Sequence, residues 1–167
     1  MTDVATNQAF RPERPGRSRT DDRTMRDGRS FEVIDREECV RLLSGAVVGR
    51  MVFTDGALPA VVPVTFAVDG DAVVCRTTAG SRLARAADGA VLALEADHLD
   101  VARRAGWSVV VTGLAEVVTA EDEVRRVGEL VQPWAPGDHD VVIRLRTTVL
   151  TGRRVERFEL PGTDSVA

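Results

Sequence analysis

Residues 46–77, AVVGRMVFTDGALPAVVPVTFAVDGDAVVCRT, alternate short valine-rich runs with turn residues. The runs span 46–53, 60–68 and 72–77. They are separated by Thr54-Asp55-Gly56 and Asp69-Gly70-Asp71. An Asp-Gly step between β-type runs predicts a tight hairpin, because glycine readily adopts the positive φ that these turns require. The stretch therefore predicts three consecutive antiparallel strands.

The flanking sequence predicts helices and further strands. Asp35 followed by Glu38 is typical of a capped helix start, so we expect a helix over 35–44. Thr119 is expected to cap an amphipathic helix that runs to about Val131. The other expected elements are a short helix over 80–88 and strands over 90–95, 107–118, 141–145 and 149–158. The connection over 96–106 argues against a simple meander.

These elements predict a mainly β fold with peripheral helices, most economically a small antiparallel barrel, because closure removes exposed sheet edges. Residues 1–30 contain few apolar residues, so we expect a disordered N-terminal tail. One folded domain is expected over 31–160, followed by a short C-terminal tail over 161–167.

Composition restricts the function classes. The chain has 167 residues, of which 44% are hydrophobic, and no apolar run approaches the ~18–20 residues that a membrane span needs. Residues 1–30 also lack the apolar segment of ~7–15 residues that is expected of a secretory signal. We therefore expect a cytoplasmic protein with no membrane partner. A net charge of −4 argues against nucleic acid as a partner. All 22 basic residues are arginine, which excludes chemistry that uses a lysine Schiff base.

Residues 75–82, CRTTAGSR, lead from a predicted strand through glycine into a predicted helix. Free backbone N–H groups at a helix start, together with hydroxyl and guanidinium groups, can hold a phosphate. A capped helix with two solvent-facing arginines explains the same residues.

Proline interrupts the run Val61-Val62-Pro63-Val64-Thr65. Because proline cannot donate a ladder hydrogen bond, it is confined to strand edges or to places where pairing is interrupted. An interrupted strand leaves backbone groups free to contact a planar polar ring, whereas a plain edge strand is the simpler explanation.

Conventional catalytic groups are not evident. His98 and His139 lie apart, each beside carboxylates, so we expect no metal site. Both cysteines are expected to be small buried hydrophobes, and core positions are the default for Trp107 and Trp134, with an interface as the alternative. No catalytic residue can be named, so any catalysis is expected to depend on a bound cofactor.

Several motifs occur together in an order that is typical of one family. They are Val48-Gly49-Arg50-Met51, Leu58-Pro59, Val61-Val62-Pro63-Val64, Arg76-Thr77-Thr78-Ala79-Gly80-Ser81-Arg82, the stretch from Gly106 to Glu116, Pro133-Trp134-Ala135-Pro136-Gly137 and Thr151-Gly152-Arg153-Arg154. In this order they resemble the pyridoxamine 5'-phosphate oxidase-like family of flavin-binding split barrels, and most closely its actinobacterial branch related to nitroimidazole-resistance proteins.

The resemblance implies a six-stranded antiparallel split β-barrel that forms a homodimer with FMN at the interface. It places Val62, Pro63, Val64 and Thr65 along the isoalloxazine. It places Arg76, Thr77, Ser81 and Arg82 at the ribityl phosphate. Ser108 would reach the flavin from the second subunit.

The chain departs from pyridoxamine phosphate oxidases themselves at Leu58, Thr65 and Leu83, where those enzymes have basic residues, and it lacks their Arg-x-His segment. The resemblance therefore implies an FMN-dependent oxidoreductase that acts on another small molecule. A deazaflavin-dependent reductase, with a basic groove near Arg50, Arg103 and Arg104, and a non-catalytic flavin-binding or flavin-sequestering protein are the alternatives.

Overall fold

The structure is a computed structural model that describes residues 29–157, so the expected tails lie almost wholly outside the described residues. Its strands are β1 (Arg29–Ile34), β2 (Val48–Asp55), β3 (Leu58–Asp69), β4 (Ala72–Thr77), β5 (Val91–Asp100), β6 (Ala105–Val118), β7 (Val141–Arg146) and β8 (Val149–Arg157). Its helices are α1 (Arg36–Gly45), α2 (Arg82–Ala87) and α3 (Glu121–Leu130).

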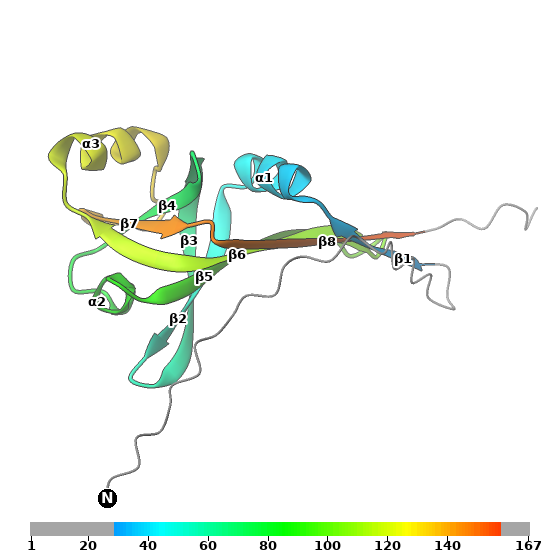
Figure 1. The fold of residues 1–167 in the computed structure, drawn as a ribbon, viewed down its shortest axis with the longest axis horizontal. Coiled ribbons are helices and arrows are strands. Elements are labelled where there is room, and N and C mark those ends of the chain that lie inside the picture. The colour runs from blue at the N-terminus through cyan, green and yellow to red at the C-terminus, as the bar shows by residue number, and fades with distance from the viewer. Residues whose placement is uncertain (1–28, 158–167) are drawn as a thin grey trace, which may run out of the picture.

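The sheet closes on itself through β6. The strand order is β1-β8-β6-β5-β2-β3-β4-β7, and β7 pairs again with β6. Every pairing is antiparallel. Strands β2 to β7 therefore form a closed six-stranded barrel, while β8 and β1 extend the sheet beside it (Figure 1). The expected mainly β antiparallel barrel is confirmed.

The long strand β6 changes partners at Gly113. Pairing with β8 ends at Thr112 and pairing with β5 ends at Leu114, whereas residues from Ala115 onward pair with β7. A Cβ atom at Gly113 would lie 1.8 Å from the Arg146 carbonyl oxygen. Glycine is therefore required where the strand bends from one sheet partner to the next.

Both Asp-Gly steps form the expected hairpins. Asp55 pairs with Leu58, and Gly56 and Ala57 between them have φ values of 55° and 66°. Two consecutive positive φ values match a type I′ turn, whose twist suits a two-residue hairpin. Gly70 likewise has a φ of 61° in the turn between β3 and β4.

One expectation about the strands was wrong, and one strand was not predicted. The predicted strand over 90–95 continues to Asp100, and a short turn then joins β5 directly to β6, so 96–106 is not a long connection. Residues 96–100 belong to the strand because they pair with β6, as Asp97 does with Ser108. Several of them are polar, so their hydrophobicity does not predict a strand. β1 also went unpredicted, because it is an edge strand that depends on pairing with β8.

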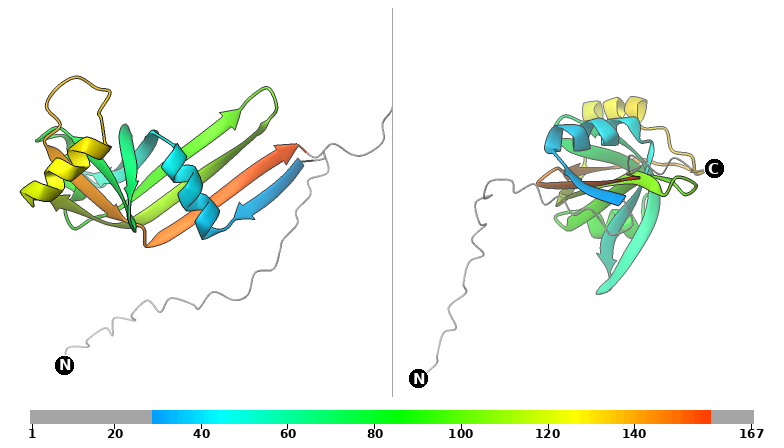
Figure 2. Two further views of the ribbon diagram at one scale, coloured as in Figure 1. Left: turned by 90° about the horizontal axis from the view of Figure 1, so that it is seen from above. Right: turned by 90° about the vertical axis from the view of Figure 1, so that its right-hand side faces the viewer.

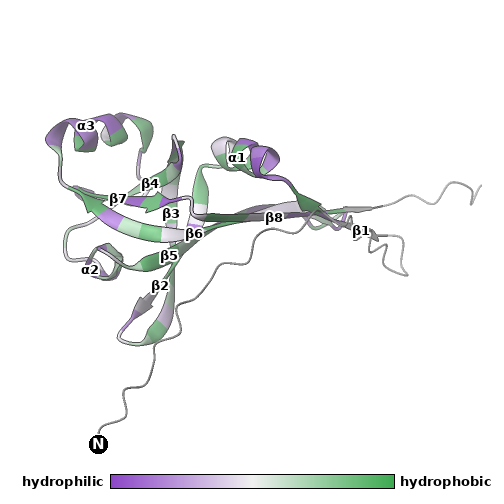
Figure 3. Cartoon of the chain, viewed as in Figure 1, coloured by the Kyte–Doolittle hydropathy of each residue, from purple (hydrophilic) through white to green (hydrophobic). Residues whose placement is uncertain are grey.

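The helices cover opposite sides of the barrel. α1 and α3 lie on one side and α2 on the other (Figures 1 and 2). Buried residues such as Met51, Leu94 and Val111 form the main core, and a smaller cluster around Val127 lies beneath α3. The hydropathy colouring of Figure 3 shows polar stretches on α1 and α3 and mainly apolar strands around the barrel. No helix in the described part of the chain is long and apolar enough to cross a membrane.

Helix starts follow the predicted pattern at α1 but not at α3. The Asp35 carboxylate accepts a hydrogen bond of 2.9 Å from the Glu38 backbone N–H, as expected of an N-cap. The cap residue of α3 is Ala120, with no side-chain cap, so the prediction for Thr119 was wrong. Glu121, Asp122 and Glu123 occupy the first turn of α3, where negative charge favours the helix dipole.

Glu38 has a second role, which is to tie α1 to β8. Its carboxylate accepts hydrogen bonds of 2.5 and 2.6 Å from Arg41 and a further bond from Arg154. Hydrogen bonding to Arg41 and then to Arg154 lowers the pKa of Glu38 to about 2. Both cysteines are buried, as predicted, and burial raises the pKa of the Cys75 thiol to about 12.

Candidate functional site

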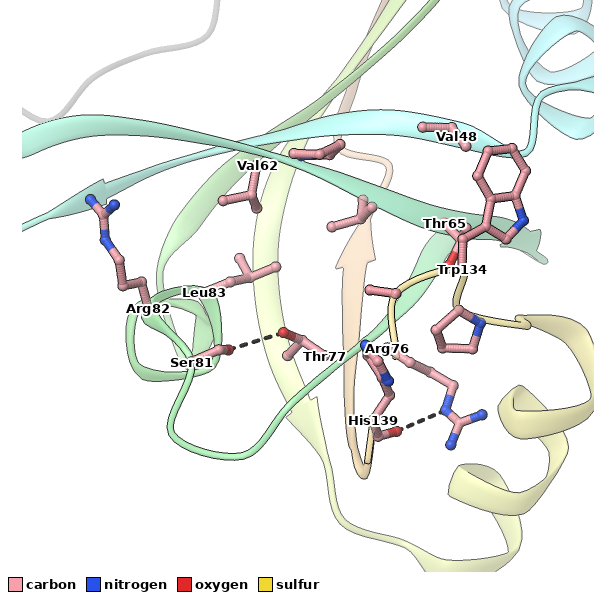
Figure 4. Close-up of a pocket in the computed structure, with 14 residues that line it drawn as sticks. Val48, Val62, Thr65, Arg76, Thr77, Ser81, Arg82, Leu83, Trp134 and His139 are labelled. Atoms are coloured by element: carbon pink, nitrogen blue, oxygen red, sulfur yellow. Dashed lines mark hydrogen bonds between the residues drawn. The ribbon is translucent and has the colours of Figure 1, made fainter. Parts of the chain in front are cut away.

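A pocket of about 480 Å³ lies where β3 and β4 diverge (Figure 4). β3 pairs with β4 from Phe66 to Asp69, and earlier residues of β3 pair with β2 on the other side. Beyond the Phe66–Cys75 pair, the last residues of β4, Arg76 and Thr77, pair with β7. The two strands thus form a fork, and the pocket opens inside it.

Eight of the nine residues expected at a cofactor site line this pocket. They are Val62, Pro63, Val64, Thr65, Arg76, Thr77, Ser81 and Arg82. The sequence placed them in two separate segments, and the fork brings these segments to facing walls. Six further residues complete the lining, namely Val48, Leu83, Pro133, Trp134, Ala135 and His139.

The β3 wall explains why proline occurs inside a strand. Pro63 is the register partner of Arg50 on β2, and its other side faces the pocket rather than another strand. A residue without an N–H is tolerated where the ladder is interrupted. Of the two explanations that the sequence left open for Pro63, an interrupted strand pairing is therefore the one that fits the structure.

Two hydroxyl groups lie together at one end of the pocket. The Oγ1 atom of Thr77 and the Oγ atom of Ser81 are 3.0 Å apart. Ser81 also caps α2, since its Oγ accepts a 3.0 Å hydrogen bond from the Ala84 backbone N–H. A serine hydroxyl can accept two hydrogen bonds and donate one. Ser81 can therefore keep both contacts as an acceptor and donate its own proton into the pocket.

The two arginines line the pocket, but their guanidinium groups are held at its rim. Arg82 Nε donates to Asp55 Oδ2 at 2.5 Å, and the side chain points away from Thr77 and Ser81 (Figure 4). Arg76 Nε donates to the His139 carbonyl oxygen at 2.9 Å. Because α2 has only six residues, its dipole adds little positive potential to the pocket. The positive charge comes from the two arginine side chains.

The 131–140 loop closes one side of the pocket, and sequence reasoning missed its role. Trp134 is 74% exposed and lies over the pocket instead of in the core, so the default expectation was wrong. Pro133, Pro136 and Gly137 keep this segment out of the sheet ladder. An indole inside a Pro- and Gly-rich loop was the available signal.

Ser108 is the ninth expected residue, and it lies outside this pocket. It sits on β6 opposite Asp97 of β5 and Arg153 of β8. There it lines a separate hollow of about 480 Å³, together with residues that include Arg104 and Trp107. Within one chain, the structure does not bring Ser108 to the other eight.

The arginines considered for a deazaflavin groove do not line the pocket either. Arg50 donates from Nη1 to Glu95 at 3.0 Å and to Asp97 at 3.1 Å. Arg103 pairs with the carboxylate of the nearby Asp100. Their positive charges are directed to carboxylates of β5, while Arg104 lines the same hollow as Ser108.

A closed six-stranded antiparallel barrel with an open fork between two strands defines a split β-barrel protein. The family model for pyridoxamine 5'-phosphate oxidase matches residues 35–159. The chain belongs to this family, which confirms the resemblance.

Several known proteins are similar to this chain. The uncharacterized protein Rv0080 of Mycobacterium tuberculosis is 43% identical over 127 residues, which are 73% of this chain and 84% of that protein. Among solved structures, the FAD binding protein from Mycobacterium smegmatis is 31% identical with a TM-score of 0.59, and the match covers 74% of this chain and 97% of that one. A conserved protein of unknown function from Corynebacterium diphtheriae is 27% identical with a TM-score of 0.62, over 74% of this chain and 96% of that one.

Proposed function

We propose that this protein binds a flavin, with FMN as the first candidate, in the pocket at the β3–β4 fork and that it is an oxidoreductase acting on a small planar molecule. The observation that carries the proposal is that β3, β4 and the start of α2 converge on one pocket, where the Thr77 and Ser81 hydroxyls lie together at one end and Arg76 and Arg82 stand at the rim. A flavin mononucleotide has the same division, with a flat ring at one end and a phosphate at the other.

The size and lining of the pocket suit such a ligand. Its volume of about 480 Å³ is within the roughly 300–1,000 Å³ of small-molecule sites. Apolar side chains, including Val62, Val64 and Leu83, line much of it, and they can cover the faces of a flat ring. The exposed backbone of β3 around Pro63 offers carbonyl groups to the polar edge of that ring.

Charge at the other end suits a phosphate. Arg76 and Arg82 together bring two positive charges, which balance a doubly charged phosphate. Each uses Nε in the hydrogen bond described above, so the Nη groups remain suited to an anion. The Ser81 hydroxyl adds a directed donor between them.

A bound flavin supplies hydride and electron transfer at its ring. The protein's own residues need to bind and orient the ring and to exclude water around it. No carboxylate of the described residues lines the pocket, which is consistent with chemistry that needs no side-chain base. The valines of β3 and the 131–140 loop would shield the ring.

FAD is the second candidate cofactor. The Mycobacterium smegmatis structure that matches over 97% of its own length is described as an FAD binding protein, which favours this choice. The Arg82 side chain at the edge of the pocket is exposed, so the additional nucleotide of FAD could extend past it into solvent.

We further propose a homodimer in which Ser108 of the partner subunit completes the site. Ser108 lies on the part of β6 that extends beyond the barrel, and several apolar side chains around it are exposed, including Leu99 at 65% and Val101 at 84%. Light scattering after size exclusion should give twice the chain mass, and a monomer at micromolar concentration would contradict this part of the proposal.

The experiment is to purify the protein, record its visible spectrum, and identify the cofactor by mass spectrometry after denaturation. The proposal expects stoichiometric FMN or FAD, reduced by NADH, NADPH or reduced deazaflavin and reoxidised by an acceptor. Bound flavin that every reductant leaves unchanged would indicate a non-catalytic flavin-binding protein. Protein that neither contains flavin nor gains thermal stability from it would refute the proposal.

A further inference from the structure

Helix α3 lies over one face of β4 and β7, and it leads directly into the 131–140 loop that closes the pocket (Figure 1). Its apolar attachment to the barrel is a small cluster in which Val127 and Val131 pack with strand residues that include Val74 and Val142. This cluster is separate from the main core, and Val127 is the one fully buried residue of α3. The helix and its loop are therefore held to the barrel by few buried groups.

The helix also has little stability of its own. It has ten residues, and no side chain caps its first turn. Gly128 lies in its interior, where glycine is destabilising. Helices of this length are marginal without tertiary contacts. Contacts with the barrel, rather than bonds within α3, therefore decide whether the helix stays in place.

An ion-pair network fastens α3 at the end away from the pocket. The Nη1 and Nη2 atoms of Arg126 donate to the two carboxylate oxygens of Asp69 at 2.7 and 2.8 Å. Asp69 is the last residue of β3, and Arg144 of β7 donates to Glu123 of α3 beside it. A bidentate pair fixes geometry as well as adding energy. Asp69 therefore helps to set the position of the helix on the barrel.

Arg76 fastens the same segment at the pocket end. Its Nε donates to the His139 carbonyl oxygen, and its Nη1 lies 3.9 Å from the place that a Cβ atom would take on Gly128 of α3. Figure 4 shows the hydrogen bond to His139 and the guanidinium beside the helix. Among residues 29–157, no other hydrogen bond joins the 131–140 loop to a wall of the pocket. Arg76 is thus shared by the pocket, the helix and the loop.

We propose that residues 121–140, which are α3 and the loop after it, open and close as one lid over the pocket, and that Asp69 and Arg76 are the positioning residues that hold this lid closed. Opening would remove the wall of the pocket that consists of Pro133, Trp134, Ala135 and His139. A ligand in the pocket is then retained while the lid is closed. The inference goes beyond the proposed function and rests on it only in taking a flavin as that ligand.

A thiol beneath the lid reports its opening. Val142→Cys places this thiol in the cluster under α3, where Val142 is fully buried. The native Cys75 is buried in the main core and is the control within the same molecule. Iodoacetamide should alkylate the introduced thiol at least roughly tenfold faster than Cys75, because a local opening costs less free energy than unfolding of the barrel. Peptide mass spectrometry measures both rates.

Asp69→Asn tests the ion pair at the far end of the lid. The substitution keeps the size of the side chain and removes the charge that holds Arg126. Alkylation beneath the lid should become roughly two- to fivefold faster, as expected for a partly exposed ion pair. Glu116→Gln is the matched control, because Glu116 pairs with Arg144 and Arg146, which lie outside the lid. It should leave the alkylation rate unchanged.

Hydrogen exchange tests Arg76 and needs no added cysteine, so it also serves if Val142→Cys folds poorly. The Val124 backbone N–H donates to the Ala120 carbonyl oxygen at 2.9 Å, one helical turn from Gly128. Arg76→Ala should speed exchange at this amide roughly tenfold relative to the amides of β5, because a charged hydrogen bond is lost. Arg82→Ala also removes a positive charge from the pocket lining, but Arg82 is bonded to Asp55, so the exchange should not change.

FMN connects the lid with the pocket. If release requires opening, FMN at roughly ten times its dissociation constant should slow alkylation beneath the lid about tenfold. Four outcomes would overturn the inference: alkylation no faster than at Cys75, equal rates in Asp69→Asn and Glu116→Gln, equal exchange in Arg76→Ala and Arg82→Ala, or FMN that binds without slowing alkylation. Flavin binding is measured separately by absorbance. A protein that binds no flavin refutes the proposed function, while alkylation and exchange in the ligand-free protein still decide whether the lid exists.

Discussion

Removal of the Arg82 side chain should weaken flavin binding more than removal of its helical neighbour Arg85. Arg82 lines the pocket and pairs with Asp55, whereas Arg85 donates from Nη1 to the Gly80 carbonyl oxygen and does not line the pocket. Both residues lie on α2, and both substitutions remove one positive charge. The comparison between them therefore separates a direct phosphate contact from a general change in charge.

The magnitude follows from the two interactions of Arg82. A hydrogen bond to a charged group contributes about 1.5–3 kcal/mol. Engagement of a phosphate would weaken the exposed ion pair with Asp55, which offsets about 0.2–1 kcal/mol of this gain. The net loss in Arg82→Ala is then about 0.5–2.8 kcal/mol, or roughly a two- to hundredfold rise in the FMN dissociation constant.

The assay is titration of FMN into apoprotein, followed by quenching of flavin fluorescence at two salt concentrations. Arg85→Ala should stay within about twofold of the wild type, because screened charge at a distance has little effect. Asp55→Asn should bind FMN slightly more tightly, since Arg82 is then released. Equal dissociation constants for Arg82→Ala and Arg85→Ala would refute the placement of the phosphate beside Arg82.

Two further predictions concern folding. Gly113→Ala should destabilise the protein by about 3 kcal/mol or more, because its Cβ would overlap a backbone oxygen. Gly45→Ala is the control and should change the stability little, because its Cβ meets nothing within 4 Å. Urea unfolding measures both variants, and equal midpoints would contradict the close approach at the bend. The lowered pKa of Glu38 means that its contribution to stability is fully present above the ordinary pKa of 4.5 and is lost as the pH falls toward about 2. Glu38→Gln should therefore flatten the pH dependence of the unfolding free energy between those values, and an unchanged slope would contradict the ionic tie to β8.

The sequence predicted the parts of the fold that depend on local signals. Asp55-Gly56 and Gly70 marked two hairpins because positive φ is a local requirement, and Asp35 marked a helix start because its cap is formed within four residues. β1 and the outer part of β5 escaped prediction, since ladder pairing with strands distant in the sequence holds them in place.

The candidate site shows the same division. Pro63 and the hydroxyls of Thr77 and Ser81 stood out because their chemistry is unusual for a strand and its following turn. Trp134 and His139 did not, because the Pro- and Gly-rich sequence of their loop indicates a loop but not the path that brings it to the pocket. The hydrogen bond between Arg82 and Asp55 joins residues that are 27 positions apart, and it became evident from the fold alone.

A crystal structure of the protein with bound flavin would show whether the β3–β4 fork is the flavin site. We expect the ring along residues 62–65 and the phosphate beside Ser81, within hydrogen-bond distance of Arg82. Electron density for the flavin elsewhere on the barrel, or a fork that stays empty at saturating FMN and FAD, would show that the fork is not a flavin site.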